Sequence, residues 1–80
     1  MAMHDRMHPM GLWRVDVRSG DVWRVRVFEH EDDAVRCYRD ASADLAASVR
    51  ERRASEGETV LTGPDGRLLV RWSVRGPLAS

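Results

Sequence analysis

The feature that most constrains this chain is one amphipathic helical period in residues 32–56. Apolar residues recur there at intervals of three or four, which places them on one stripe of a helix. Acidic residues crowd the start of the segment and Arg residues its end, the polarity that a helix dipole favours. We therefore predict a helix over residues 32–56, closed by Gly57 as a left-handed C-terminal cap. Its apolar stripe consists of Ala34, Tyr38, Ala41, Leu45 and Val49.

Strand-like segments flank this helix on both sides. Apolar and charged side chains alternate in them with a period of two, as in half-buried antiparallel strands. Residues 19–21 have turn composition, and Gly63-Pro64-Asp65-Gly66 is a strong turn signal, so each pair of segments is predicted to form a β-hairpin. The predicted strands are residues 12–18 and 22–28 before the helix, and residues 59–62 and 67–75 after it.

The resulting element order is β-β-α-β-β. This order favours an α+β fold, a two-layer sandwich in which one long helix lies across a four-stranded, mainly antiparallel sheet. We expect Trp13, Trp23 and Trp72 to be the large core residues on the helix-facing side. If the first and last strands pair in parallel, the strand order 2-1-4-3 resembles a β-grasp arrangement. The alternatives are pairing of the last strand with the second, or pairing across a dimer axis.

Length and composition limit the domain organisation. Eighty residues make one small domain, with little room for a deep active-site cleft beside its core. We assign the ββαββ domain to residues 11–76, a flexible N-terminal tail to residues 1–10 and a short C-terminal tail to residues 77–80. No apolar run is long enough to span a bilayer, and the first residues lack a secretory apolar region, so we expect a cytoplasmic protein without membrane contacts.

The charge pattern is the most specific functional signal. All 13 basic residues are Arg, which we interpret partly as the codon bias of a high-GC bacterial gene, and 13 acidic residues bring the net charge to zero. Strand alternation predicts an Arg-rich sheet face away from the helix, opposed there only by Asp16. The predicted binding residues are Arg14, Arg18, Arg24, Arg26, Arg67, Arg71 and Arg75.

An Arg-rich face is suited to an anionic partner. We therefore expect a small non-catalytic protein–protein interaction or regulatory module that binds an acidic protein surface. The alternative is a small nucleic-acid-binding protein that uses the same face, although zero net charge is atypical of that class. A homodimer through an uncovered sheet edge or face is a further hypothesis.

Candidate catalytic and metal-binding residues are few. No serine has a His and Asp arranged to activate it, and no phosphate-binding or zinc motif is present, so we expect no enzyme activity, no cofactor and no metal. Cys37 is interpreted as a small packed residue and His30 as an exposed neighbour of the helix start. The Met and His residues of the N-terminal tail contain Cu(I) ligand types, but no rigid element would hold them in place. These residues are Met1, Met3, His4, Met7, His8 and Met10.

Overall fold

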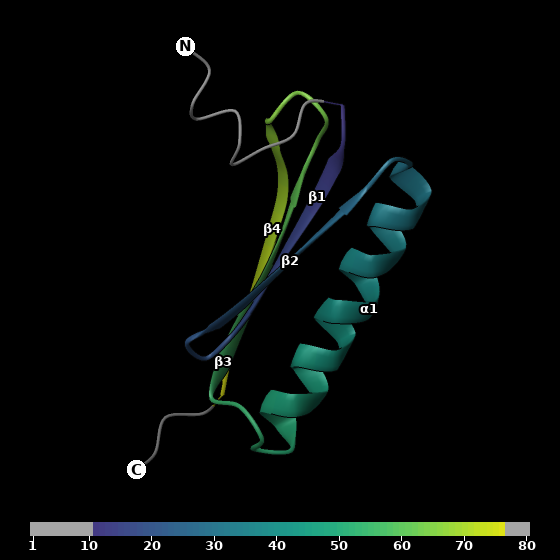
Figure 1. The fold of residues 1–80 in the computed structure, drawn as a ribbon. Helices are drawn as coiled ribbons and strands as arrows, with labels where there is room; N and C mark the ends of the chain where they lie inside the picture. The colour runs from purple at the N-terminus through teal and green to yellow at the C-terminus, as the bar shows by residue number, and fades with distance from the viewer. Residues whose placement is uncertain (1–10, 77–80) are drawn as a thin grey trace.

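The computed structural model describes residues 11–76 of the chain. The predicted tails, residues 1–10 with their Met and His side chains and residues 77–80, lie outside the described residues. Five elements follow one another in the predicted order (Figure 1). They are the strands β1 (Trp13–Ser19) and β2 (Val22–Phe28), the helix α1 (Glu31–Arg50), and the strands β3 (Glu56–Thr62) and β4 (Leu68–Arg75).

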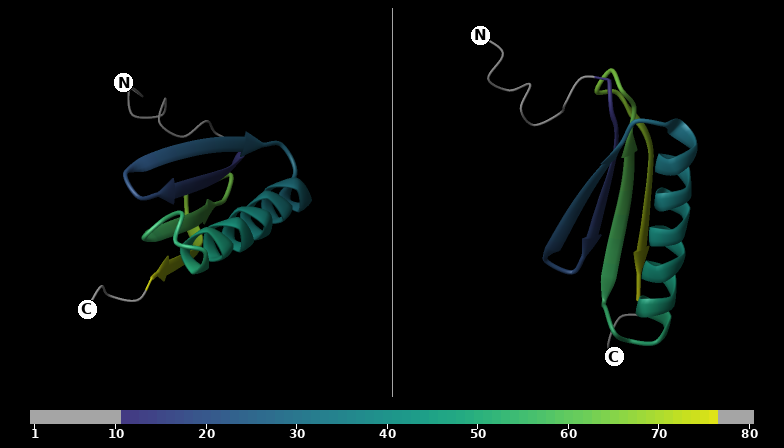
Figure 2. Two further views of the ribbon diagram at one scale, coloured as in Figure 1. Left: turned by 90° about the horizontal axis from the view of Figure 1, so that it is seen from below. Right: turned by 45° about the vertical axis from the view of Figure 1, so that its right-hand side comes forward.

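The four strands form one antiparallel sheet in the order β2-β1-β3-β4, and α1 covers one of its faces (Figure 2). The predicted α+β class, a two-layer ββαββ fold, is confirmed. The β-grasp-like order 2-1-4-3 is wrong, and within the described residues β4 pairs with neither β1 nor β2. β3 lies beside β1, has seven residues instead of the predicted four, and pairs along most of β1.

The helix ends six residues earlier than predicted. Arg52, not Gly57, takes the left-handed conformation after the helix, with φ of 64°. The backbone N–H of Arg53 donates to the carbonyl oxygen of Ser48 at 2.7 Å, which helps to satisfy the helix end without a glycine. Gly57 is therefore available to β3. The predicted dipole polarity is present, with three acidic residues in the first turn and Arg50 in the last.

The core lies between α1 and the middle of the sheet. Val15 of β1 and Ala34 of α1 are fully buried, and Leu61 of β3 is 6 % exposed. Burial of such apolar side chains is the main favourable term for a domain of this size. Half-buried side chains pack around these three residues: Trp13, Val17, Phe28, Val35, Cys37 and Tyr38.

The three tryptophans do not share one face, contrary to the prediction. Trp13 packs against the core, and Trp72 lies on the helix-facing side of β4, where it pairs with the buried Thr59. Trp23 of β2 is 51 % exposed and points away from α1. The prediction for Trp23 is therefore wrong, and the cause lies in the turn between β1 and β2.

That turn contains two residues, Gly20 and Asp21, because Ser19 pairs directly with Val22. Gly20 supplies the positive φ, 61°, that a tight hairpin turn requires. The prediction assumed a turn of three residues, 19–21. A shift of one residue moves every side chain of a strand to the opposite face. As a result, the even-numbered residues of β2 face α1, and the odd-numbered residues face outward.

The turn between β3 and β4 is as predicted. Gly66 has a φ of 84°, and the N–H of Gly63 donates to the carbonyl oxygen of Arg67 at 2.9 Å. A register shift at the end of β3 aligns Thr62 with Leu68, so the first residues of β4 lie out of phase with the rest of the strand.

Candidate functional site

The seven predicted binding residues do not lie on one face. Four of them, on β1 and β4, point to the outer face, which is the sheet face away from α1. Arg24 and Arg26 of β2 share the helix-facing side with Val17 and Val15, their partners on β1, so the prediction of an outward position is wrong for both. Arg67 precedes β4 in the turn and is exposed. The four outer-face residues are Arg14, Arg18, Arg71 and Arg75.

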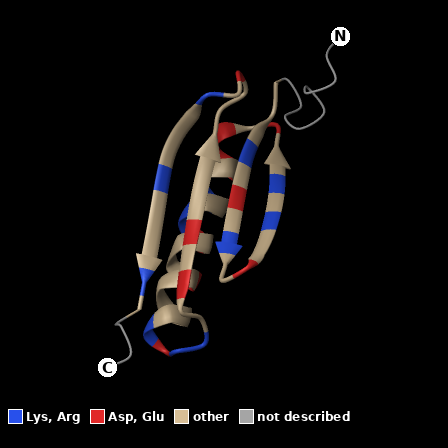
Figure 3. Ribbon diagram, turned by 90° about the vertical axis from the view of Figure 1, so that its left-hand side faces the viewer, with Lys and Arg blue, Asp and Glu red and all other residues tan. Residues whose placement is uncertain are grey.

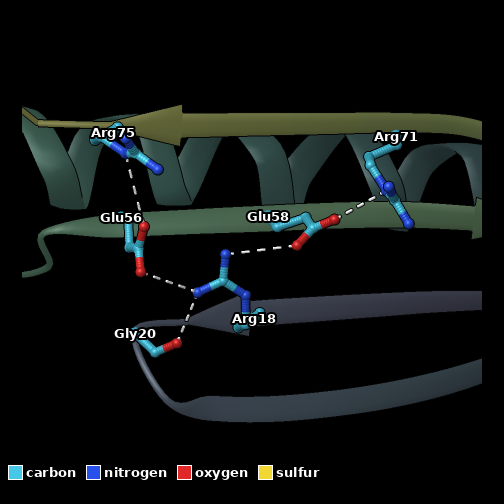
Figure 4. A network of polar contacts seen from close by, with 6 residues as sticks. All are labelled: Arg18, Gly20, Glu56, Glu58, Arg71 and Arg75. Carbon is cyan, nitrogen blue, oxygen red and sulfur yellow. Dashed lines mark hydrogen bonds and ion pairs between the residues drawn. The ribbon is translucent and has the colours of Figure 1, made fainter.

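Carboxylates of β3 neutralise most of the outer face (Figure 3). Glu58 forms an ion pair with the guanidinium of Arg71 at 2.9 Å and accepts a hydrogen bond from Arg18 at 3.5 Å (Figure 4). Glu56 lies 3.4 Å from Arg18 and 3.8 Å from Arg75. The expected Arg-rich patch is therefore a network of alternating charges across three strands.

Asp16 completes this neutralisation on β1. Both of its carboxylate oxygens accept from the Arg14 guanidinium, each at 2.9 Å. Four Arg side chains and three carboxylates leave the strand positions of the outer face with one net positive charge. Glu56 and Glu58 are absent from the predicted binding residues because the predicted third strand begins at Thr59. No local signal marks the start of this strand, because Glu and Gly are both depleted in strands.

β2 carries a row of exposed apolar side chains on one face of the described sheet. Its outward side chains, Trp23, Val25 and Val27, are 51 %, 50 % and 45 % exposed, and we call them the apolar stripe. The Arg18 guanidinium lies 5.8 Å from the ring centre of Trp23, within the range of a cation–π contact. Among the strands of residues 11–76, β2 also lies at an edge of the sheet. The stripe therefore lies beside an open row of backbone hydrogen-bonding groups.

The other side of β2 borders a groove against α1. The end of the β1–β2 hairpin diverges from the helix, as both Figure 1 and Figure 2 show, and the groove there has a volume of about 580 Å³. Arg24 and Arg26 line it from β2, and Asp40 and Asp44 line it from α1. Within residues 11–76, neither of these two Arg side chains lies within 4.0 Å of a carboxylate oxygen. Arg26 instead lies over the Phe28 ring, 5.5 Å from its centre.

Cys37 also lines this groove and is half-buried. Burial raises the pKa of its thiol, the charge of Asp40 adds to this effect, and the Arg26 guanidinium opposes it. A raised pKa leaves little reactive thiolate at neutral pH, which is the opposite of what a nucleophilic cysteine needs. His30 is exposed at the start of α1, as predicted, and its side chain does not cap the helix.

Across residues 11–76, no three His, Cys, Asp or Glu side chains gather closely enough to hold a metal ion. No helix among these residues is both long enough and apolar enough to cross a membrane. Comparisons with protein-family models, with curated proteins and with solved structures gave no significant match to this chain.

Proposed function

We propose that this chain is a small non-catalytic protein-binding module whose docking surface is β2. The observation that carries the proposal is the apolar stripe, three exposed apolar side chains on one face of an edge strand. Open edges and adjoining apolar surface are liabilities in a monomer, and they mark interaction sites when they are not protected. β2 has neither Lys nor Pro, its outward side chains are all uncharged, and its two charged side chains, Arg24 and Arg26, lie on the helix-facing side.

An acidic partner fits this surface. Arg24 and Arg26 emerge from the same strand, and no carboxylate of the described residues pairs with them. The outer-face Arg residues are less suited to bind an acidic partner, because each already has a carboxylate partner. Binding would only exchange one ion pair for another. The proposed binding residues are therefore Arg24 and Arg26, instead of the seven predicted Arg residues, together with the apolar stripe.

Position-dependent cross-linking tests the proposal. A photoreactive p-benzoylphenylalanine replaces Val25 in the apolar stripe or, as the control, Ser73, which is exposed on the outer face of β4. We expect a discrete protein adduct from position 25 and not from position 73. Adding Arg24→Glu and Arg26→Glu to the position-25 variant should abolish the adduct, while circular dichroism verifies the fold. Equal labelling from both positions, or no adduct at all, would contradict the proposal.

A salt titration tests whether the partner is nucleic acid instead of protein. Phosphate contacts make affinity fall steeply with salt, so generic DNA and RNA are titrated at low and high ionic strength. Because the outer face has one net positive charge, we expect no binding at low salt. Salt-sensitive binding that Arg24→Glu and Arg26→Glu remove would assign β2 to nucleic acid instead.

A further inference from the structure

We propose that the partner binds as a fifth strand on the open edge of β2, and that its sequence alternates apolar and acidic residues. This inference rests on the proposed function and specifies its ligand as an extended acidic peptide segment. The hydrogen-bonding phase of β2, the direction of its side chains and its charge each support it.

The hydrogen-bonding phase follows from the register of the hairpin. Hydrogen-bonded and non-hydrogen-bonded pairs alternate along an antiparallel ladder, and the pair that closes a two-residue turn is hydrogen-bonded. That closing pair is Ser19 and Val22, so the even-numbered residues of β2 bond to β1. The backbone N–H and C=O groups of Trp23, Val25 and Val27 consequently point to the open edge.

The same three residues form the apolar stripe. A strand added at this edge would place every second side chain on the outer face, directly beside them. Apolar side chains at those positions would cover the stripe, whose members are each about half exposed. The intervening side chains of the added strand would point to the groove side, where Arg24 and Arg26 lie. Carboxylates are the complementary choice there.

Charge also argues against a second copy of this chain as the occupant. A symmetric antiparallel pairing of two β2 strands with the greatest overlap is centred on Val25. It would place Arg24 of one copy directly opposite Arg26 of the other, twice in the interface. Like charges at such cross-strand positions are destabilising. An acidic strand replaces both repulsions with attractions.

Asp40 and Asp44 weaken the preference of the groove for an acidic strand. Both line the groove from α1 together with Arg24 and Arg26 from β2, so their negative charges partly offset the two guanidinium charges without forming ion pairs. They also repel carboxylates of an incoming strand. Asp40→Asn and Asp44→Asn should therefore tighten binding of an acidic strand, although neither residue lies at the open edge of β2.

Three synthetic peptides of the length of β2 test the inference with the full chain. One alternates Val and Glu, the second alternates Val and Lys, and the third has the composition of the first with its Val and Glu residues in separate blocks. We expect saturable binding of the Val–Glu peptide, at least about tenfold tighter than of the other two. Arg24→Glu with Arg26→Glu should reverse the preference between Glu and Lys.

Amide hydrogen exchange provides the decisive measurement. When the Val–Glu peptide binds, the amides of Trp23, Val25 and Val27 should gain protection, whereas those of Arg24 and Arg26 already belong to the ladder with β1 and should not change. Uniform protection along β2, protection elsewhere, or equal affinity for the Lys peptide would overturn the inference.

The two proposals fail separately. A partner adduct at position 25 without the alternating protection would leave β2 as a docking surface but exclude strand addition. An adduct with twice the mass of the chain would replace the acidic strand by a second copy and would also overturn the inference. Absence of any adduct contradicts the proposed function itself.

Discussion

Gly57 of β3 lies directly beneath Leu45 of α1, so that a Cβ atom at position 57 would be 2.8 Å from Leu45 Cδ2. Leu45 is 5 % exposed, and the carbonyl oxygen of Arg18 would be 3.1 Å from the same Cβ on the other side. The helix approaches the sheet closely at this point because residue 57 has no side chain.

We expect Gly57→Ala to lower the free energy of unfolding by about 1–3 kcal/mol, because the added methyl group overpacks the contact between the two layers. Urea denaturation measures the change. Gly63→Ala is the control, since its Cβ would meet no atom closer than 3.4 Å. Leu45→Val should restore part of the loss in the Gly57→Ala background. Equal effects at the two glycines would contradict the close approach.

A second contact between the layers is polar. Ser42 Oγ of α1 and Thr59 Oγ1 of β3 are 2.7 Å apart, and Thr59 is fully buried. We expect Thr59→Val to destabilise the fold by about 1 kcal/mol, because the hydroxyl of Ser42 loses its partner. The double variant with Ser42→Ala should cost less than the sum of the single variants, as measured by a double-mutant cycle in urea. Additive costs would show that the two hydroxyls do not interact.

The ion pairs of the outer face should contribute unequally to the stability of the fold. Glu58 is 17 % exposed and contacts two guanidinium groups, so Glu58→Gln should cost about 0.5–1 kcal/mol. Arg75 is 76 % exposed and 3.8 Å from Glu56, so Arg75→Ala should have almost no effect. Thermal unfolding of both variants is measured at low and high salt. Salt screens the ion pairs, so it should reduce the destabilisation caused by Glu58→Gln. A larger loss for Arg75→Ala would contradict the observed geometry.

Tryptophan fluorescence should report the two faces of the sheet. In variants that retain one tryptophan each, with Phe at the other two positions, acrylamide should quench Trp23 more strongly than Trp13 or Trp72. The reason is that Trp23 is 51 % exposed on the outer face, whereas the other two are half-buried on the helix-facing side. Quenching of Trp23 that matched the other two would contradict the two-residue turn.

Cys37 should react with iodoacetamide at a higher pH than a free thiol does. Burial raises the pKa of its thiol, so the pH of the half-maximal alkylation rate should be higher than for a free thiol. Removing the opposing cation with Arg26→Gln should move this midpoint up further, and Asp40→Asn should move it down. The midpoint is measured instead of the rate because it does not depend on access to the sulfur. A midpoint below that of a free thiol would contradict the effect of burial.

Local patterns were sufficient for the elements themselves. The intervals of three and four in the helix stripe, the alternation of period two in the strands and the Gly63-Pro64-Asp65-Gly66 turn each depend on neighbouring residues alone. They predicted the α+β class, the element order and the packing of one helix on one face of the sheet. The candidate site was predicted less well, because Arg24, Arg26 and Trp23 were placed on the wrong sides of β2.

The sequence by itself determined which segments become helix and strand, because those preferences arise within a few residues. Only the tertiary structure decided the direction of the β2 side chains and the position of β3. The composition of residues 19–21 suits a turn of either two or three residues, and the pairing of Ser19 with Val22 selects one. Glu56 and Gly57 are poor strand formers that enter the sheet through pairing. Gly57 pairs with Ser19 of β1 and Glu56 with Arg75 of β4, and the missing side chain of Gly57 leaves room for Leu45. Such contacts join residues far apart in the chain, and no local pattern encodes them.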